Sequence, residues 1–176
     1  HDALPISMLL IALACFHFLS SGVQDYKALV DGPLHTSQLL DEANLQFKIQ
    51  VQEWKNVLLR GKQPVELTKY WGQFDERQVQ VQAILGQLIT QTSANPELKS
   101  SIEKLRQSHR VLGTNYLKGR DAFVAANGDP TVGDTAVKGM DRATSEEMST
   151  LVEQLRTQGN QQSELISADA NRKIGR

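Results

Sequence analysis

Apolar residues in this chain recur at alternating intervals of four and three residues over four long stretches, and this spacing constrains the fold more than any other feature. Such spacing places the apolar side chains along one seam of an α-helix, through which helices pack in coiled coils and bundles. No strand-like alternation competes with it. The four series are Leu40, Asn44, Phe47, Val51, Trp54 and Leu58; Leu67, Trp71, Phe74, Gln78, Val81, Leu85 and Leu88; Leu98, Ile102, Leu105, His109, Leu112, Tyr116, Gly119 and Phe123; and Val137, Asp141, Thr144, Met148, Leu151, Leu155, Gln158, Gln162 and Leu165.

Three breaks separate these stretches, and each combines residues that end one helix with a proline that opens the next. They fall at residues 60–64, 93–97 and 126–130, and Asn95 is the expected N-cap before Pro96. Gly32 and Pro33 are expected to kink or interrupt the first helix near its start. The predicted helices span about 24–60, 64–92, 96–126 and 130–174. Short connections make neighbours antiparallel, so the sequence predicts an all-α, up-down-up-down four-helix bundle with long first and fourth helices.

The N-terminal residues differ from the rest of the chain. The chain lacks an initial Met, and residues 1–6 resemble the translation of a sequencing adapter, with a genuine N-terminus as the alternative. Residues 8–19 are strongly apolar but shorter than the roughly 20 residues that span a bilayer. We interpret residues 7–21 as a truncated first transmembrane helix, with a cleaved secretory signal as the alternative. Either interpretation places residues 22–176 outside the cytoplasm.

Charge and motifs exclude several classes of function. Lys and Arg number 19 against 20 Asp and Glu, without a basic stretch, which argues against a nucleic-acid binder. Cys15, the single cysteine, rules out a disulfide framework or a zinc knuckle. The sequence has no GxSxG, HExxH, P-loop or GxGxxG motif, so we expect neither an enzyme nor a cofactor. His109 has no Glu-x-x-His partner for a metal, and we expect it to be a hydrogen-bonded core residue.

Four sequence strings point to a family. They are residues 47–61 (FKIQVQEWKNVLLRG), 69–71 (KYW), 109–116 (HRVLGTNY) and 137–142 (VKGMDR). Together they resemble the periplasmic sensor domain of bacterial methyl-accepting chemotaxis proteins, over about residues 24–174. The resemblance implies a homodimer in the inner membrane, whose HAMP linker and cytoplasmic hairpin bind a histidine kinase and an adaptor protein. Neither of these parts is present before Arg176.

The resemblance also implies a function. The domain would bind a small chemoeffector, such as an organic acid or an amino acid, and pass a helix displacement across the membrane to a kinase-control module. Direct sensing and sensing through a binding protein both stay open, as do attraction and repulsion. One alternative is the same bundle serving a sensor histidine kinase or a cyclase. An alternative of another class is a secreted helical structural protein, with residues 8–19 as its cleaved signal.

Candidate ligand-binding residues gather at the end expected to lie away from the membrane. Arg60, Arg120 and Arg142 would clamp a small carboxylate at or near the dimer interface, since guanidinium groups suit bidentate carboxylate recognition. Lys55 belongs to the same cluster, and Tyr70 lies off the seam, where it covers a pocket or braces the turn. The alternative is that these cations form ordinary surface ion pairs.

Asn44 occupies a seam position of the first helix. A single buried asparagine in an apolar seam sets helix register, because any other alignment leaves its amide without partners. We therefore predict that Asn44 sets register or dimer pairing and does not bind a ligand.

Overall fold

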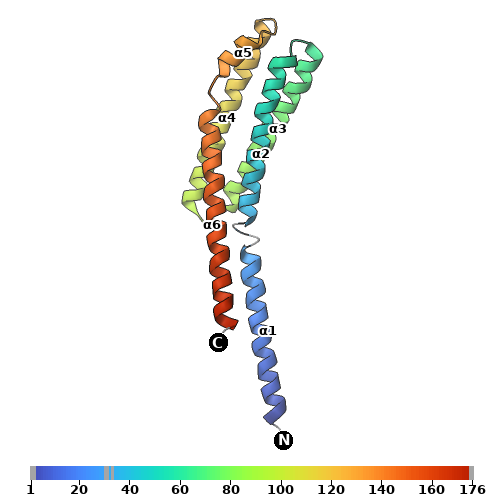
Figure 1. Cartoon of the computed structure of the whole chain (residues 1–176). Helices are drawn as coiled ribbons and strands as arrows, with labels where there is room; N and C mark the ends of the chain where they lie inside the picture. The colour runs from blue at the N-terminus through green and yellow to red at the C-terminus, as the bar shows by residue number, and fades with distance from the viewer. Residues whose placement is uncertain (1–2, 30–31, 33, 175–176) are drawn as a thin grey trace. The chain divides into compact units, whose positions relative to one another are not determined.

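The structure is a computed structural model that describes residues 3–29, 32 and 34–174. The described residues are all-helical, with six α-helices and no strand (Figure 1). The helices are α1 (Ala3–Leu29), α2 (His35–Arg60), α3 (Pro64–Gln91), α4 (Pro96–Ala125), α5 (Pro130–Val137) and α6 (Arg142–Ile174). The predicted all-α class is confirmed.

The chain divides into two units, which we call the terminal unit (residues 1–35 and 155–176) and the central unit (residues 36–154). In the terminal unit, α1 carries the apolar run, and large apolar side chains such as Ile11, Phe16 and Leu19 are exposed to solvent. Within the part of the chain that the structure describes, no helix combines the length and apolarity needed to cross a membrane. Residues 1 and 2 of the expected adapter sequence lie outside the described residues.

The first and fourth predicted helices are each described as two helices. Within the predicted span 24–60, α1 ends at Leu29 and α2 begins at His35, and residues 30, 31 and 33 lie outside the described residues. In place of one helix over 130–174, α5 ends at Val137 and α6 begins at Arg142. Gly139 in this second break has a φ of 75°, a left-handed conformation that interrupts a right-handed helix.

The core of the central unit is built from one side of each of its helices. On α4 the buried positions from Ile102 to Phe123 are those of the predicted seam. On α2 every second predicted position is buried as expected, and at the alternate positions the preceding residue is buried instead: Ala43, Gln50 and Val57 in place of Asn44, Val51 and Leu58. The buried residues include Leu40, Ala43, Phe47, Gln50, Trp54 and Val57 on α2; Tyr70, Phe74, Val81, Leu85 and Leu88 on α3; Ile102, Leu105, His109, Leu112, Tyr116, Gly119 and Phe123 on α4; and Val137, Thr144, Met148 and Leu151 beyond.

Aromatic contacts join α2, α3 and α4. The Tyr116 ring lies 5.3 Å from that of Trp54 and 5.1 Å from that of Phe74, measured between centroids. Tilted and edge-on contacts at this separation are favourable for aromatic pairs. Tyr116 of α4 therefore packs against α2 on one side and α3 on the other.

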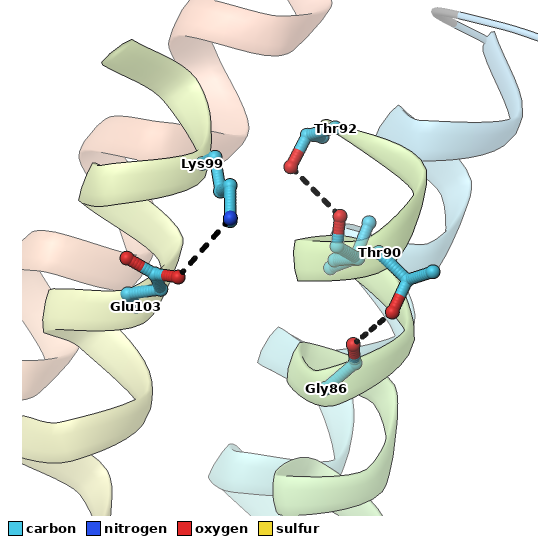
Figure 2. Close-up of polar contacts among 6 residues, drawn as sticks. Gly86, Thr90, Thr92, Lys99 and Glu103 are labelled. Atoms are coloured by element: carbon cyan, nitrogen blue, oxygen red, sulfur yellow. Dashed lines mark hydrogen bonds and ion pairs between the residues drawn. The ribbon is translucent and has the colours of Figure 1, made fainter. Parts of the chain in front are cut away.

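Local polar contacts stabilise the end of α3 and the start of α4 on either side of their connection (Figure 2). The buried hydroxyl of Thr92 donates to the Leu88 carbonyl at 2.8 Å, and the same carbonyl accepts from the Thr92 backbone amide at 2.9 Å. Asn95 is the N-cap of α4, as predicted, and its side chain accepts from the Leu98 amide at 3.1 Å. On the first turns of α4, Lys99 and Glu103 form an exposed ion pair at 3.8 Å. These contacts begin α4 at a defined residue.

Candidate functional site

A groove of about 650 Å³ runs between the start of α3 and the end of α4. Its volume falls within the roughly 300–1,000 Å³ of ligand-binding pockets. It combines an apolar floor with one cationic and two acidic side chains. The lining residues are Leu67, Thr68, Trp71, Gly72, Asp75, Arg120, Asp121, Val124 and Ala125.

Arg120 is held in place on two sides. Its guanidinium carbon lies 4.7 Å from the centroid of the Trp71 ring, in cation–π geometry. Its Nε and Nη2 groups donate to Asp121 Oδ1 at 3.1 and 2.7 Å. Trp71 in turn stacks on Phe74, with ring centroids 4.7 Å apart and planes 13° apart. Both contacts thus orient the guanidinium, and within the described chain its Nη1 group makes no hydrogen bond.

Arg60 contacts Tyr70, the residue that precedes Trp71 on α3. Its Nη1 group donates to the Tyr70 hydroxyl at 2.7 Å, and its guanidinium carbon lies 5.6 Å from the Tyr70 ring centroid. The Lys69 ammonium lies 5.0 Å from the same centroid. Tyr70 is only 6% exposed. These contacts fit the bracing role for Tyr70, because its hydroxyl joins the end of α2 to the start of α3.

The structure therefore pairs two predicted arginines with aromatic residues, but not with each other. Tyr70 and Trp71 are consecutive on α3, so their side chains leave the helix roughly 100° apart. Arg60 and Arg120 accordingly lie on different sides of α3. Lys55 and Arg142 are exposed, and among the described residues no hydrogen bond, ion pair or ring contact joins them to either arginine.

Two residues of the groove, Asp75 and Trp71, were not predicted from the sequence as site residues. Asp75 lies four residues after Trp71, one turn along the same side of α3, and this spacing was available as a signal. Trp71 was assigned to the seam, yet it is half-buried at the groove while Tyr70 is buried. Outside the groove, Asn44 was also assigned to the seam, but it is half-buried, and the preceding residue Ala43 is fully buried in its place.

The core next to the groove contains polar aromatic groups. Tyr116 is 2% exposed, and burial, followed by the negative charge of Asp141, raises the pKa of its hydroxyl. The Trp54 indole nitrogen is buried and has no hydrogen-bond partner among the described residues. Among the residues that the structure describes, no group of three or more His, Cys, Asp or Glu side chains is arranged to hold a metal ion.

One known protein resembles nearly the whole chain. The "Methyl-accepting chemotaxis protein CtpH" of Pseudomonas aeruginosa is 52% identical over 166 residues, which cover 94% of this chain. The resemblance to methyl-accepting chemotaxis proteins is confirmed. The chain spans 29% of the length of that relative. No family model matches the chain, and no solved structure matches it.

Proposed function

We propose that the chain is the extracytoplasmic sensory domain of a chemotaxis receptor, with a role in binding and signalling and not in catalysis. The observation that carries this proposal is the 52% identity to a methyl-accepting chemotaxis protein over 94% of the chain. Ligand binding would bias two packings of the helices, which requires a different affinity for each. A small helix displacement would then reach a cytoplasmic kinase-control module.

In this proposal the central unit packs as an antiparallel four-helix bundle, formed by α2, α3, α4 and the α5–α6 segment, and pairs in a homodimer. The terminal unit would attach the sensor to the inner membrane and leave the central unit in the periplasm. The exposed apolar side chains of α1 support this attachment, because exposed apolar patches are typical of membrane and protein contacts.

We propose the α3–α4 groove as the ligand site. The oriented guanidinium of Arg120 would bind a ligand carboxylate through its Nη1 group. Asp75 and Asp121 add negative charge to the same groove, so a ligand that also carries an amine is favoured over a simple organic acid. The apolar floor, which includes Leu67 and Val124, would hold the remainder of the molecule. The expected ligand class is therefore an amino acid or a related zwitterion.

A hybrid receptor tests the function. This chain replaces the matching region of the relative, and the hybrid is the sole chemoreceptor of a motile strain. Kinase activity is measured during exposure to amino acids, organic acids and amines. We expect a dose-dependent response to at least one zwitterion. A hybrid that reaches the membrane and is methylated, but responds to none of these compounds, would contradict the ligand class. A hybrid whose kinase activity is uncontrolled would contradict the receptor function.

Variants of the hybrid test the site. We expect Arg120→Ala to raise the half-maximal ligand concentration at least tenfold, and Trp71→Ala to do so more weakly. Arg60→Ala and Arg142→Ala are the matched controls, since each removes a guanidinium that does not line the groove. Equal losses in all three arginine variants would favour a shared clamp over the groove. Unchanged responses in all three variants would exclude both the shared arginine clamp and the groove as the ligand site.

A further inference from the structure

A chain of side-chain hydrogen bonds, buried at His109 and Gln50 and part-buried at its two ends on α3, crosses the core of the central unit. His109 of α4 is 0% exposed and Gln50 of α2 is 1% exposed. The His109 ring and the Gln50 amide meet through His109 Nε2 and Gln50 Oε1 at 2.8 Å, and His109 Nδ1 lies 2.8 Å from Gln82 Nε2 on α3. The Gln50 amide nitrogen donates to Gln78 Oε1, also on α3. We call Gln50, Gln78, Gln82 and His109 the polar layer.

The hydrogen bonds of the polar layer have one consistent direction. Gln82 Nε2 also donates to the Arg106 carbonyl at 3.0 Å, which fixes the nitrogen end of this amide toward α4. His109 Nδ1 must then accept from Gln82, so the ring proton sits on Nε2 and is donated to Gln50 Oε1. Because Gln50 Oε1 accepts from His109, Gln50 Nε2 is the atom that donates to Gln78 Oε1. Every member of the layer therefore requires the neutral Nε2–H form of His109.

The surroundings of the ring favour that form. Phe47 contacts the ring edge-on, with centroids 5.5 Å apart, and the other contacts are the two glutamine amides. None of these contacting groups is titratable. Burial lowers the pKa of His109 from 6.5 to about 4, so the ring is neutral near pH 7. A second ring proton would place two donors face to face at Nδ1.

We propose that the polar layer is a register lock, which holds α2, α3 and α4 in a single axial alignment. An apolar seam tolerates a slide of one helical turn, about 5.4 Å, because one apolar side chain replaces another. The polar layer does not tolerate such a slide, because the slide would separate all of its hydrogen-bonded pairs. Gly113, one turn after His109 on α4, belongs to the same device. A Cβ at this position would lie 2.6 Å from the Gln78 amide nitrogen, so glycine leaves the room that Gln78 occupies.

Pulsed EPR on the full chain in detergent tests the lock. Spin labels are attached through Lys48→Cys on α2 and Arg110→Cys on α4, both exposed, in a Cys15→Ser background. The starting protein should give one narrow distance. The triple variant Gln50→Leu/Gln82→Leu/His109→Leu should stay helical but give a second distance, or a distribution at least twice as broad. A single, unchanged narrow distance would overturn the proposal.

Two controls separate register from stability. Leu105→Ala removes volume one turn before His109 and should lower the melting temperature while keeping a single distance. His109→Gln keeps one donor and one acceptor in the layer and should also keep a single distance. Broadening in Leu105→Ala equal to that of the triple variant would overturn the proposal, because any loose core would then suffice.

A measurement on the unsubstituted layer keeps the proposal testable even if the triple variant does not fold. The ¹⁵N chemical shifts of the His109 ring should show the neutral Nε2–H tautomer at pH 7. A ring protonated on Nδ1, or one that titrates near pH 6.5 like a solvated histidine, would contradict the hydrogen-bond direction on which the lock depends.

Discussion

The polar layer and the α3–α4 groove are built from similar parts but differ in their access to water. Both place a planar nitrogen-containing side chain against an aromatic ring: His109 against Phe47 in the layer, and Arg120 against Trp71 in the groove. His109 is fully buried, whereas the side chain of Arg120 is 29% exposed. The same kind of contact is therefore closed to water in one place and leaves the polar group accessible to solvent in the other.

The difference follows from what happens when each contact is broken. A buried polar group that loses its partner costs about 1–3 kcal/mol, because no water replaces the partner. A partly exposed ion pair is worth about 0–1 kcal/mol, because water solvates both groups once they separate. Changes in the layer should therefore act on folding, and changes in the groove should act mainly on binding.

Acidification should give the largest effect. The pKa of His109 is about 4 in the folded chain against 6.5 in its ordinary state, so the unfolded chain binds more protons between these values. The contribution of His109 to stability is complete above about pH 6.5 and is lost as the pH falls toward 4. The full loss is about 3 kcal/mol in the free energy of unfolding.

Urea unfolding at several pH values measures this loss, with His109→Gln as the control. Carboxylates also titrate in this range, but they are common to both proteins. The stability difference between the two should therefore shrink as the pH falls from 7 to 4. A constant difference would mean that His109 titrates equally in the folded and unfolded chains.

Gly119→Ala should give the next largest effect, in the core near the groove. A Cβ at Gly119 would lie 2.5 Å from Val137 Cγ1 and 3.3 Å from Trp54 Cη2, so α5 would have to move. Overpacking of this kind costs about 1–3 kcal/mol, and the better helix propensity of alanine offsets about 1 of it. We expect a net loss of about 1.5 kcal/mol in denaturant unfolding. Unchanged stability would show that α5 shifts freely.

The success of sequence reasoning differed between helices for a physical reason. On α4 the pattern leaves little choice, and the predicted seam from Ile102 to Phe123 is buried. On α2 the residue pairs at 43–44 and 50–51 fit a seam about equally well. Gln50 is buried because His109, distant in sequence, satisfies its amide. The sequence pattern around Gln50 gives no sign of His109, because the two residues lie on different helices. The groove likewise depends on how α3 and α4 are rotated against each other, which places Trp71 and not Tyr70 at its wall.

Gly72→Ala should have a smaller effect of opposite sign. Gly72 is an exposed residue in the interior of α3, and apart from its chain neighbours and the backbone of its own helix a Cβ there would meet no described atom within 4 Å. Alanine should therefore stabilise the helix by about 0.8 kcal/mol, through its higher helix propensity. Because Gly72 lines the groove, the added methyl group also reduces the space for a ligand. Thermal unfolding should show the gain, and a loss of stability would indicate that this surface of α3 is covered.

Arg120→Ala should change stability least, by about 0.5 kcal/mol, although it removes the contacts of Arg120 with both Trp71 and Asp121. Water replaces the guanidinium at this partly exposed position, and Trp71 keeps its stacking on Phe74. Thermal unfolding of Arg120→Ala and Arg120→Lys should give melting temperatures within a few degrees of the unsubstituted chain. A loss as large as that in the layer would show that Arg120 is a structural residue. A small loss, with a large effect on the ligand response, would separate the two regions as the comparison requires.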